Sequence, residues 1–378
     1  MSDVRDIVSR ALESGGALVE PIEPDGLEVL TPASLQEALD LPELCRLGFG
    51  ETLPEGAIRT GLESGWMDTL GEFMAGRGRF LRLGLDGLDS RRQSSQLEEA
   101  VRACLHLDNA TYRFQEAENC WTEYLALFFH LAAVSDEKRE DIVAVCLNQS
   151  NGLTADHLVD PLLAHLKVNE PECPGYAGDL PSPWPAEKVQ HWMAKFLPAR
   201  IRASMRPFLA GMERRLSRDL DRLFAYHTDL RREAAERLAK EHAPEDDSGR
   251  REAARIEAIE REYRAKVRDL RRKYAMTVEV ELLQGVRVAL PVARARVNVM
   301  RRKGVRPCHL DWNPLSRRLD DLYCESCGAF PGAQLVCDER QHMVCPECMA
   351  RCSSCGKSYC RACYPDRCPK CGQVRSDT

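Results

Sequence analysis

The C-terminal tail decides how this chain folds, and over residues 324–372 it reads CESCGAFPGAQLVCDERQHMVCPECMARCSSCGKSYCRACYPDRCPKCG. Ten of its cysteines form five C-x-x-C pairs, a spacing that lets two thiolates clamp one tetrahedral metal ion from a tight turn. With one more Cys and one His, this pattern predicts two or three structural Zn²⁺ ions. The expected ligands are Cys324, Cys327, Cys337, His342, Cys345, Cys348, Cys352, Cys355, Cys360, Cys363, Cys368 and Cys371.

The spacing predicts one complete site, because a short β-hairpin between residues 334 and 344 would join two of the pairs. That site is Cys324, Cys327, Cys345 and Cys348. Two schemes stay open for the other ligands. In a cross-brace, Cys337 and His342 join a later pair; in the alternative, Cys352, Cys355, Cys368 and Cys371 share a site and leave Cys360 and Cys363 to Cys337 and His342. In C-x-x-C-Gly, the glycine is expected to take the positive φ that ends the turn.

Cysteine usage points to a reducing compartment. Eleven of the 17 cysteines lie in the tail, whereas a disulfide framework is typical of small secreted chains. The chain opens without a signal-like apolar segment, and its longest apolar stretch, 125–134, is too short to span a bilayer. We therefore expect a cytoplasmic protein with no membrane contact.

The charge is unevenly distributed along the chain. Residues 1–180 carry 14 Lys and Arg against 32 Asp and Glu, whereas residues 181–378 carry 39 against 27. The acidic half would repel a polyanion, and the basic half could attract one. The alternative interpretation is that these charges only solvate the surface or face each other.

Periodicity predicts an α+β chain with five parts. The first part, residues 1–168, contains a helix over 1–15, a strand at 27–30 and helices over 31–39 and 64–74. It continues with β structure over 111–134 turning at Glu118-Asn119, a helix beginning at Ser135 and another over 154–166. We find no catalytic constellation in it. The parts are an acidic α+β domain (1–168), a Pro-rich linker (169–186), a charged helical hairpin or coiled coil (187–275), a basic antiparallel sheet (276–320) and a multi-zinc module (321–373).

Basic strands with nearby aromatic side chains suit nucleic-acid backbones and unpaired bases. The predicted sheet over 276–320 has this character, with Tyr274, Trp312 and Tyr323 close by. A merely solvated sheet would show the same pattern. The expected nucleic-acid-binding residues are Arg287, Arg294, Arg296, Arg301, Arg302, Lys303 and Arg306.

The tail resembles bacterial double-zinc-ribbon and treble-clef modules, and its first six ligands resemble the front half of a RING. It departs from a RING in the four residues between Cys337 and His342 and the three between Cys348 and Cys352. More loosely, Ser135-Asp-Glu-Lys-Arg-Glu, the Arg/Glu-rich hairpin and Asp311-Trp-Asn-Pro resemble uncharacterised bacterial proteins associated with Swi/Snf-type helicases. That resemblance implies a nucleic-acid-linked accessory role and supplies no catalytic residue.

Three functions follow as hypotheses. The first is a non-enzymatic zinc-binding accessory protein that contacts DNA, RNA or a nucleic-acid-processing machine such as a helicase. The second is a protein–protein adaptor or RING-like ligase subunit, and the third an enzyme in the N-terminal domain. The sequence leaves the oligomeric state open, since a helical arm can also dimerise.

Overall fold

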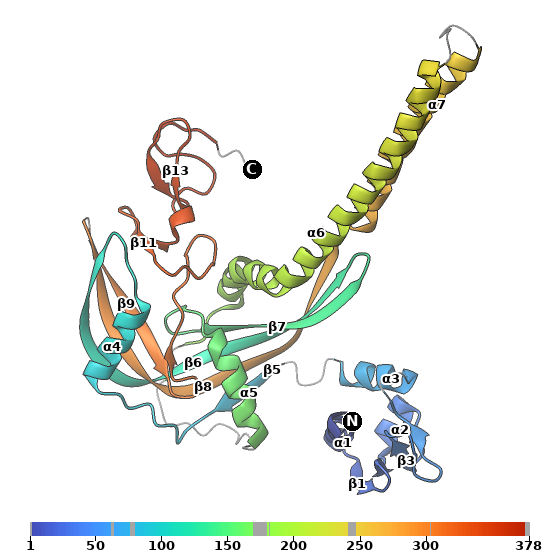
Figure 1. Cartoon of the computed structure of the whole chain (residues 1–378). Helices are drawn as coiled ribbons and strands as arrows, with labels where there is room; N and C mark the ends of the chain where they lie inside the picture. The colour runs from blue at the N-terminus through green and yellow to red at the C-terminus, as the bar shows by residue number, and fades with distance from the viewer. Residues whose placement is uncertain are drawn as a thin grey trace. The chain divides into compact units, whose positions relative to one another are not determined.

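The computed structural model describes residues 2–61, 64–75, 80–168, 180, 182–240, 247–302 and 304–374, and it divides into two units, 1–79 and 80–378. Both units combine helices with largely antiparallel strands, which confirms the α+β class (Figure 1). The domain expected over 1–168 is therefore divided at residue 79, and its second part belongs to the larger unit.

The first unit is a small four-stranded sheet with three helices. The strands lie in chain order, antiparallel except for the last pair, and Val8 and Leu12 of the first helix pack with Leu27 and Leu47 of the sheet. The helices and the strand expected in this part are confirmed. Its elements are α1 (Ser2–Ser14), β1 (Leu18–Ile22), β2 (Gly26–Leu30), α2 (Ala33–Leu39), β3 (Leu44–Gly48), β4 (Ile58–Arg59) and α3 (Gly65–Met74).

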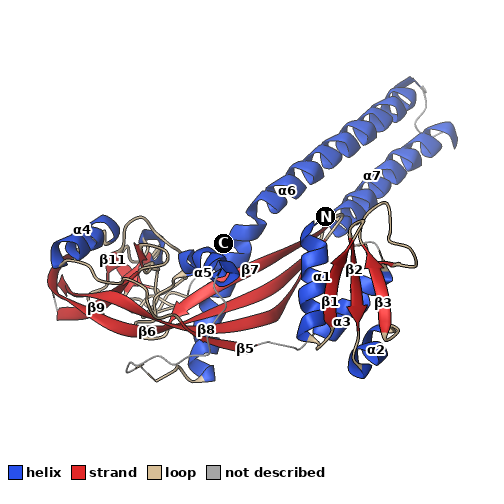
Figure 2. Cartoon of the chain, turned by 90° about the horizontal axis from the view of Figure 1, so that it is seen from below, coloured by secondary structure: helices blue, strands red, loops and turns tan. Residues whose placement is uncertain are grey.

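The second unit is built on two very long strands, β6 (Thr111–Val134) and β8 (Thr277–Arg301), which pair antiparallel along almost their whole length. The sheet order is β10-β9-β8-β6-β7, with β5 parallel to β8 (Figure 2). The other elements of this sheet and its neighbouring helix are β5 (Phe80–Gly84), α4 (Ser94–Cys104), β7 (Lys138–Asn148), β9 (Gly304–Asn313) and β10 (Arg318–Leu319).

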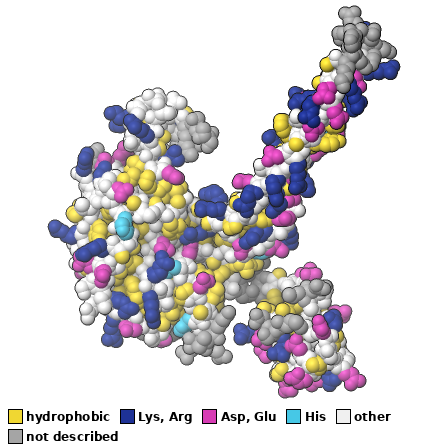
Figure 3. Space-filling model, in the orientation of Figure 1, with side chains coloured by type: hydrophobic (Ala, Val, Ile, Leu, Met, Phe, Trp, Pro, Cys, Tyr) yellow, Lys and Arg dark blue, Asp and Glu magenta, His cyan; other side chains and the backbone are white. Residues whose placement is uncertain are grey.

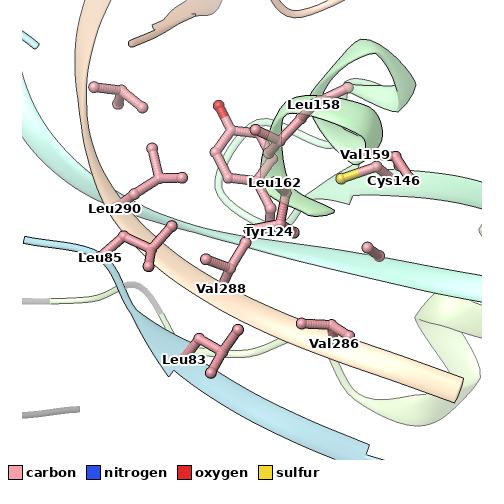
Figure 4. Packing of buried hydrophobic residues seen from close by; sticks show 13 residues of the cluster. Leu83, Leu85, Tyr124, Cys146, Leu158, Val159, Leu162, Val286, Val288 and Leu290 are labelled. Carbon is pink, nitrogen blue, oxygen red and sulfur yellow. The ribbon is translucent and has the colours of Figure 1, made fainter. Parts of the chain in front are cut away.

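Successive side chains of β6 point to opposite faces of the sheet, and both faces are buried. On one face, Tyr124 and Ala126 pack beneath the 3-10 helix η1 (Asp156–Leu158) and α5 (Val159–Val168), as Figure 4 shows for Tyr124, Leu158 and Leu162. On the other face, Leu125, Leu127 and Phe129 pack against Trp192 and Phe196 of α6 (Ala186–Lys240). A strand whose two faces are both covered reads as a nearly continuous apolar run.

The helical hairpin is confirmed. The first turns of α6 lie against the sheet, and its later turns leave the sheet beside α7 (Asp247–Lys273), running antiparallel to it (Figure 1). Phe224 packs edge-on against Tyr263, and Tyr274 donates a hydrogen bond to Asp219 at 2.8 Å. Supercoiling of the pair stays a prediction. Of its expected loop at 244–249, residues 244–246 lie outside the described residues, and 247–249 form the start of α7 instead.

Several expectations differ from the structure. The sheet expected over 276–320 is not separate, because β8 pairs with β6 across more than 140 residues of intervening chain. No turn forms at Glu118-Asn119, and Ser135 lies in the turn between β6 and β7 rather than at a helix start. The helix expected over 154–166 begins as η1 and continues as α5. Most of the expected linker, 169–179 and 181, lies outside the described residues.

Candidate metal centres

The structure gathers all twelve tail ligands into three groups of four, and within each group the ligand atoms lie within 4.8 Å of one another. The tail adds short strands to hold them: β11 (Leu335–Val336) pairs with β12 (Met343–Val344), and β13 (Met349–Arg351) pairs with β14 (Ser358–Cys360), with the 3-10 helix η2 (Pro346–Cys348) between. Group 1 is Cys324, Cys327, Cys345 and Cys348; group 2 is Cys337, His342, Cys360 and Cys363; group 3 is Cys352, Cys355, Cys368 and Cys371.

The separations fit a tetrahedral ion. Metal–sulfur bonds of about 2.3 Å place two tetrahedral thiolates about 3.8 Å apart. The Sγ atoms of Cys327 and Cys345 are 3.8 Å apart, and those of Cys352 and Cys371 are 3.6 Å apart. In group 2, Nδ1 of His342 lies 3.3 Å from the Sγ of Cys363. Each group therefore offers a closed set of four N and S ligands.

Glycine ends three of the ligand turns as expected. Gly328, Gly356 and Gly372 have φ values of 73°, 68° and 72°, and each donates its N–H to the carbonyl four residues earlier at 2.9 Å. This conformation costs little for glycine and strains any residue with a Cβ. The turn aims neighbouring amides at the first sulfur of each pair.

Those amides favour the thiolate form. Backbone N–H groups lower the pKa of Cys352 to about 7 and also lower the pKa of Cys368. Burial alone would raise the pKa of Cys324 and Cys337, but backbone N–H groups outweigh it and lower both. Each group thus holds at least one cysteine predisposed to the thiolate that binds a metal.

The three groups interlace along the chain. Group 1 uses the first and third ligand pairs, group 2 the second and fifth, and group 3 the fourth and sixth. Groups 2 and 3 both have the membership of the second scheme, and groups 1 and 2 cross as in a cross-brace because Cys337 and His342 join a later pair. The spacing alone left this choice open, because it identifies pairs but not which pairs meet.

The first group is fastened to the sheet and to α6. Glu325, between two of its ligands, accepts hydrogen bonds from Arg306 of β9 at 2.7 and 2.9 Å. Tyr323 donates to the carbonyl of Gly152 at 3.1 Å and packs edge-on against Phe196 of α6, with ring centroids 4.4 Å apart. These contacts join the beginning of the tail to the sheet and to α6.

The hairpin of the second group is fastened as well. Asn109, just before β6, exchanges two hydrogen bonds with the backbone of Val336, at 2.8 and 3.2 Å. Arg301 of β8 pairs with Asp338 at 2.9 Å, beside the ligand Cys337. Strands far apart in the sequence therefore meet at this hairpin.

The third group, in contrast, is attached only through the rest of the tail. Within the described part of the chain, the hydrogen bonds of segment 351–374 stay inside the tail, such as Arg361 N–H to the carbonyl of Cys348 at 2.9 Å. Cys371 is exposed and Cys355 is half-buried. Figure 1 shows the part of the tail around β13 standing away from the sheet.

Most of the arginines expected to bind nucleic acid are instead paired inside the protein. Arg294 forms two hydrogen bonds with the buried Asp311, at 2.7 and 2.8 Å, and Arg296 pairs with Glu116 at 2.7 Å and Glu118 at 2.6 Å. Burial would lower the pKa of Arg294, but Asp311 outweighs it and raises that pKa. The other paired residues are Arg287 with Glu123, Arg301 with Asp338, and Arg306 with Glu325.

Two of the seven residues remain. Arg302 is exposed, and no described carboxylate pairs with it. Lys303 lies outside the described residues. The expected basic face of the sheet is therefore largely neutralised by acids on β6 and β9 and in the tail.

An apolar groove, which the sequence did not indicate, lies between the sheet and the start of α6. Its volume is about 610 Å³. The side chains of Phe80, Trp184, Met193, Leu197 and Leu282 are among its lining. Alternation along β6 marks one of its walls, but the sequence does not reveal that α6 forms the other.

Comparisons with known proteins leave the chain without an assigned family. No protein-family model matches it, and no curated protein matches its sequence. Among the helices of the described residues, none has the length and apolar character needed to cross a membrane.

Proposed function

We propose that this protein is a non-enzymatic zinc-binding accessory protein whose C-terminal half contacts nucleic acid or a nucleic-acid-processing machine such as a Swi/Snf-type helicase. The observation that carries the zinc part is the closure of each group by four Cys or His ligands. Sets of thiolate and imidazole ligands in tetrahedral geometry favour Zn²⁺.

Zinc in these groups is structural in this proposal. A catalytic zinc keeps one coordination position open for water or substrate, and four protein ligands leave none. When bound, each ion would only cross-link the two segments of the tail that carry its ligands. The tail has little apolar core of its own, so metal binding would provide much of its folding free energy.

The contact with nucleic acid rests on charge. Residues 181–378 carry 39 Lys and Arg against 27 Asp and Glu, an excess of 12. The pairs of Arg294, Arg301 and Arg306 leave this excess unchanged, because both partners lie in this half. The pairs of Arg287 and Arg296 with acids of β6 lower it by two, from 12 to 10. Binding to a phosphate backbone releases counterions and weakens steeply with salt.

The test uses the full chain, because β8 and β9 need β6 to complete their sheet. Zinc per chain is measured by elemental analysis, and binding to labelled DNA and RNA by fluorescence anisotropy between about 50 and 200 mM salt. We expect three zinc ions and salt-dependent binding. A zinc-loaded chain that binds no nucleic acid at the lowest salt would remove the nucleic-acid part.

The apolar groove favours a second candidate, an adaptor that binds an apolar segment of a protein partner. Exposed apolar grooves of this size commonly mark interaction sites. A charge placed in its lining, Met193→Glu, should abolish capture of such a partner and leave nucleic-acid binding unchanged. Equal loss of both would count against two separate surfaces.

A further inference from the structure

Five cations flank the ligands of the third metal group along the chain, and none of them forms an ion pair with a described carboxylate. Between residues 349 and 374 there are five cations and one acid. No carboxylate of the described residues forms an ion pair with any of these cations, and four of them are exposed. The cations are Arg351, Lys357, Arg361, Arg367 and Lys370; the acid is Asp366.

This arrangement is the opposite of the one on the sheet. There, Arg294 and Arg306 are each held by two hydrogen bonds to one carboxylate. A cation committed to a partly buried carboxylate is a poor ligand for phosphate, because binding would first have to break that pair. The free cations of the C-terminal half therefore include a cluster at the end of the tail.

The metal itself reduces this charge without reversing it. Four thiolates around a divalent ion leave two negative charges, which must be counted. With those charges and Asp366 included, the five cations leave about two net positive charges. The second group, with three thiolates and one imidazole around its ion, removes one more and leaves about one. In Figure 3, Lys and Arg side chains lie over the part of the tail that stands away from the sheet.

The composition of this surface fits phosphate better than it fits a protein partner. Protein interfaces are built around buried apolar or aromatic side chains. Among the large apolar side chains that the described residues expose, Val374, at the end of the segment, is the only one between 349 and 374. Exposed Ser353 and Ser354 offer hydroxyl donors beside the cations, of the kind that contact phosphate.

We propose that the basic surface around the third metal group, formed by Arg351, Lys357, Arg367 and Lys370, is where this protein contacts the phosphate backbone of nucleic acid. This proposal rests on the proposed function and moves the contact from the sheet to the end of the tail. The first two metal groups anchor the tail, and the third presents the cations to the ligand.

The experiment compares two variants of the full, zinc-loaded chain with equal net charge. The tail variant carries Arg351→Gln, Lys357→Gln, Arg367→Gln and Lys370→Gln. The matched control carries Arg222→Gln, Arg232→Gln, Arg261→Gln and Arg264→Gln, four exposed cations of the helical hairpin. Binding to short single- and double-stranded DNA and RNA is titrated at several salt concentrations.

In the tail variant, we expect the slope of log K against log salt concentration to become shallower by about one unit for each cation removed. Its affinity should fall by a similar factor for all sequences. The control should keep the slope of the wild-type chain. Zinc content is measured for both; if the tail variant holds less zinc, Lys357→Gln with Lys370→Gln is used instead, with an expected loss of about two units of slope.

Three results would overturn the proposal in distinguishable ways. If the wild-type chain binds and the tail variant keeps its slope, the surface is wrong and the proposed function stands. If poly-glutamate competes as well as nucleic acid of equal charge, the surface is a general polyanion site. If the wild-type chain binds no nucleic acid at about 50 mM salt, the proposed function fails together with this inference.

Discussion

Arg306 and Glu325 form two parallel hydrogen bonds, at 2.7 and 2.9 Å, that join strand β9 to the loop between two metal ligands. Burial would lower the pKa of Arg306, but Glu325 outweighs it and raises that pKa. The same carboxylate also accepts the backbone N–H of Met343. One residue between Cys324 and Cys327 therefore ties the first metal group to the sheet.

Arg306→Met should lower the free energy of unfolding by about 2 kcal/mol, because Glu325 is left partly buried without its charged partner. Urea unfolding of the zinc-loaded chain measures this. Arg302→Met is the control, since Arg302 is exposed and unpaired among the described residues, and it should change stability by less than about 0.5 kcal/mol. Equal effects would mean that the pair does not fasten the tail.

Gly328 and Gly372 offer a matched test of whether the tail packs against α6. Both have positive φ, 73° and 72°. A Cβ at Gly328 would lie 3.0 Å from the carbonyl oxygen of Lys195 in α6, whereas at Gly372 nothing lies within 4 Å. Gly372→Ala should cost only the backbone strain, about 1 kcal/mol, and Gly328→Ala clearly more. Similar losses in urea unfolding would contradict the contact with α6.

Asn148 bridges two buried carboxylates. Its Nδ2 donates to Asp311 at 2.8 Å and to Asp320 at 2.7 Å. Asn148→Leu should lower the free energy of unfolding by about 3 kcal/mol, because both acids lose a donor in a buried site. Asn298→Leu, the same substitution at a half-buried position of β8, should cost less than about 1 kcal/mol. The network would be unimportant if the two variants unfolded at the same urea concentration.

The stability of the larger unit should also depend on pH through Asp320. Burial and the charge of Asp311 raise the pKa of Asp320 well above its ordinary value, although Asn148, Asn151 and Tyr124 oppose this. A raised pKa in the folded state contributes stability that is complete below the ordinary pKa, near 4, and is lost as the pH rises. Since Asn148→Leu removes one opposing donor and raises the pKa of Asp320 further, its loss of stability should continue to a higher pH and be larger in total. Parallel pH profiles would argue against this coupling.

The metal groups should differ in what their loss does. Cys345→Ser in group 1 and Cys368→Ser in group 3 should each reduce zinc by about one ion per chain. Only Cys345→Ser should lower the thermal midpoint of the larger unit, because group 1 is fastened to Arg306 and α6 and group 3 is not. Elemental analysis and a thermal melt test this, and a lowered midpoint for Cys368→Ser would show that group 3 supports the sheet.

The local elements were predictable because their signals are local. Apolar spacing along 209–238 and 256–274 marks the two long helices, and C-x-x-C spacing marks the ligands. The pairing of β6 with β8 was not, since strand pairing depends on a partner far along the chain. Arg287, Arg294 and Arg296 therefore look like a free basic face until Glu123, Asp311 and Glu118 are brought beside them.

For the candidate metal site, too, the local features were predictable and the long-range contacts were not. The twelve ligands could be identified from spacing, but the partners of Cys337 and His342 depend on how the tail folds back. The cations from Arg351 to Lys370 were visible in the sequence with a single acid among them. Their significance emerges only from the contrast with the paired arginines of the sheet, which the sequence cannot provide.

The interlaced arrangement of the ligands also determines the order in which the three metal groups can be completed during synthesis. During synthesis, group 1 acquires its last ligand when Cys348 emerges from the ribosome, group 2 when Cys363 emerges, and group 3 when Cys371 emerges. At the moment group 1 is complete, Cys337 and His342 are already enclosed within its loop and still lack their partners. The tail can therefore be closed only progressively toward the C-terminus, and each ion that binds holds the next half-site in place.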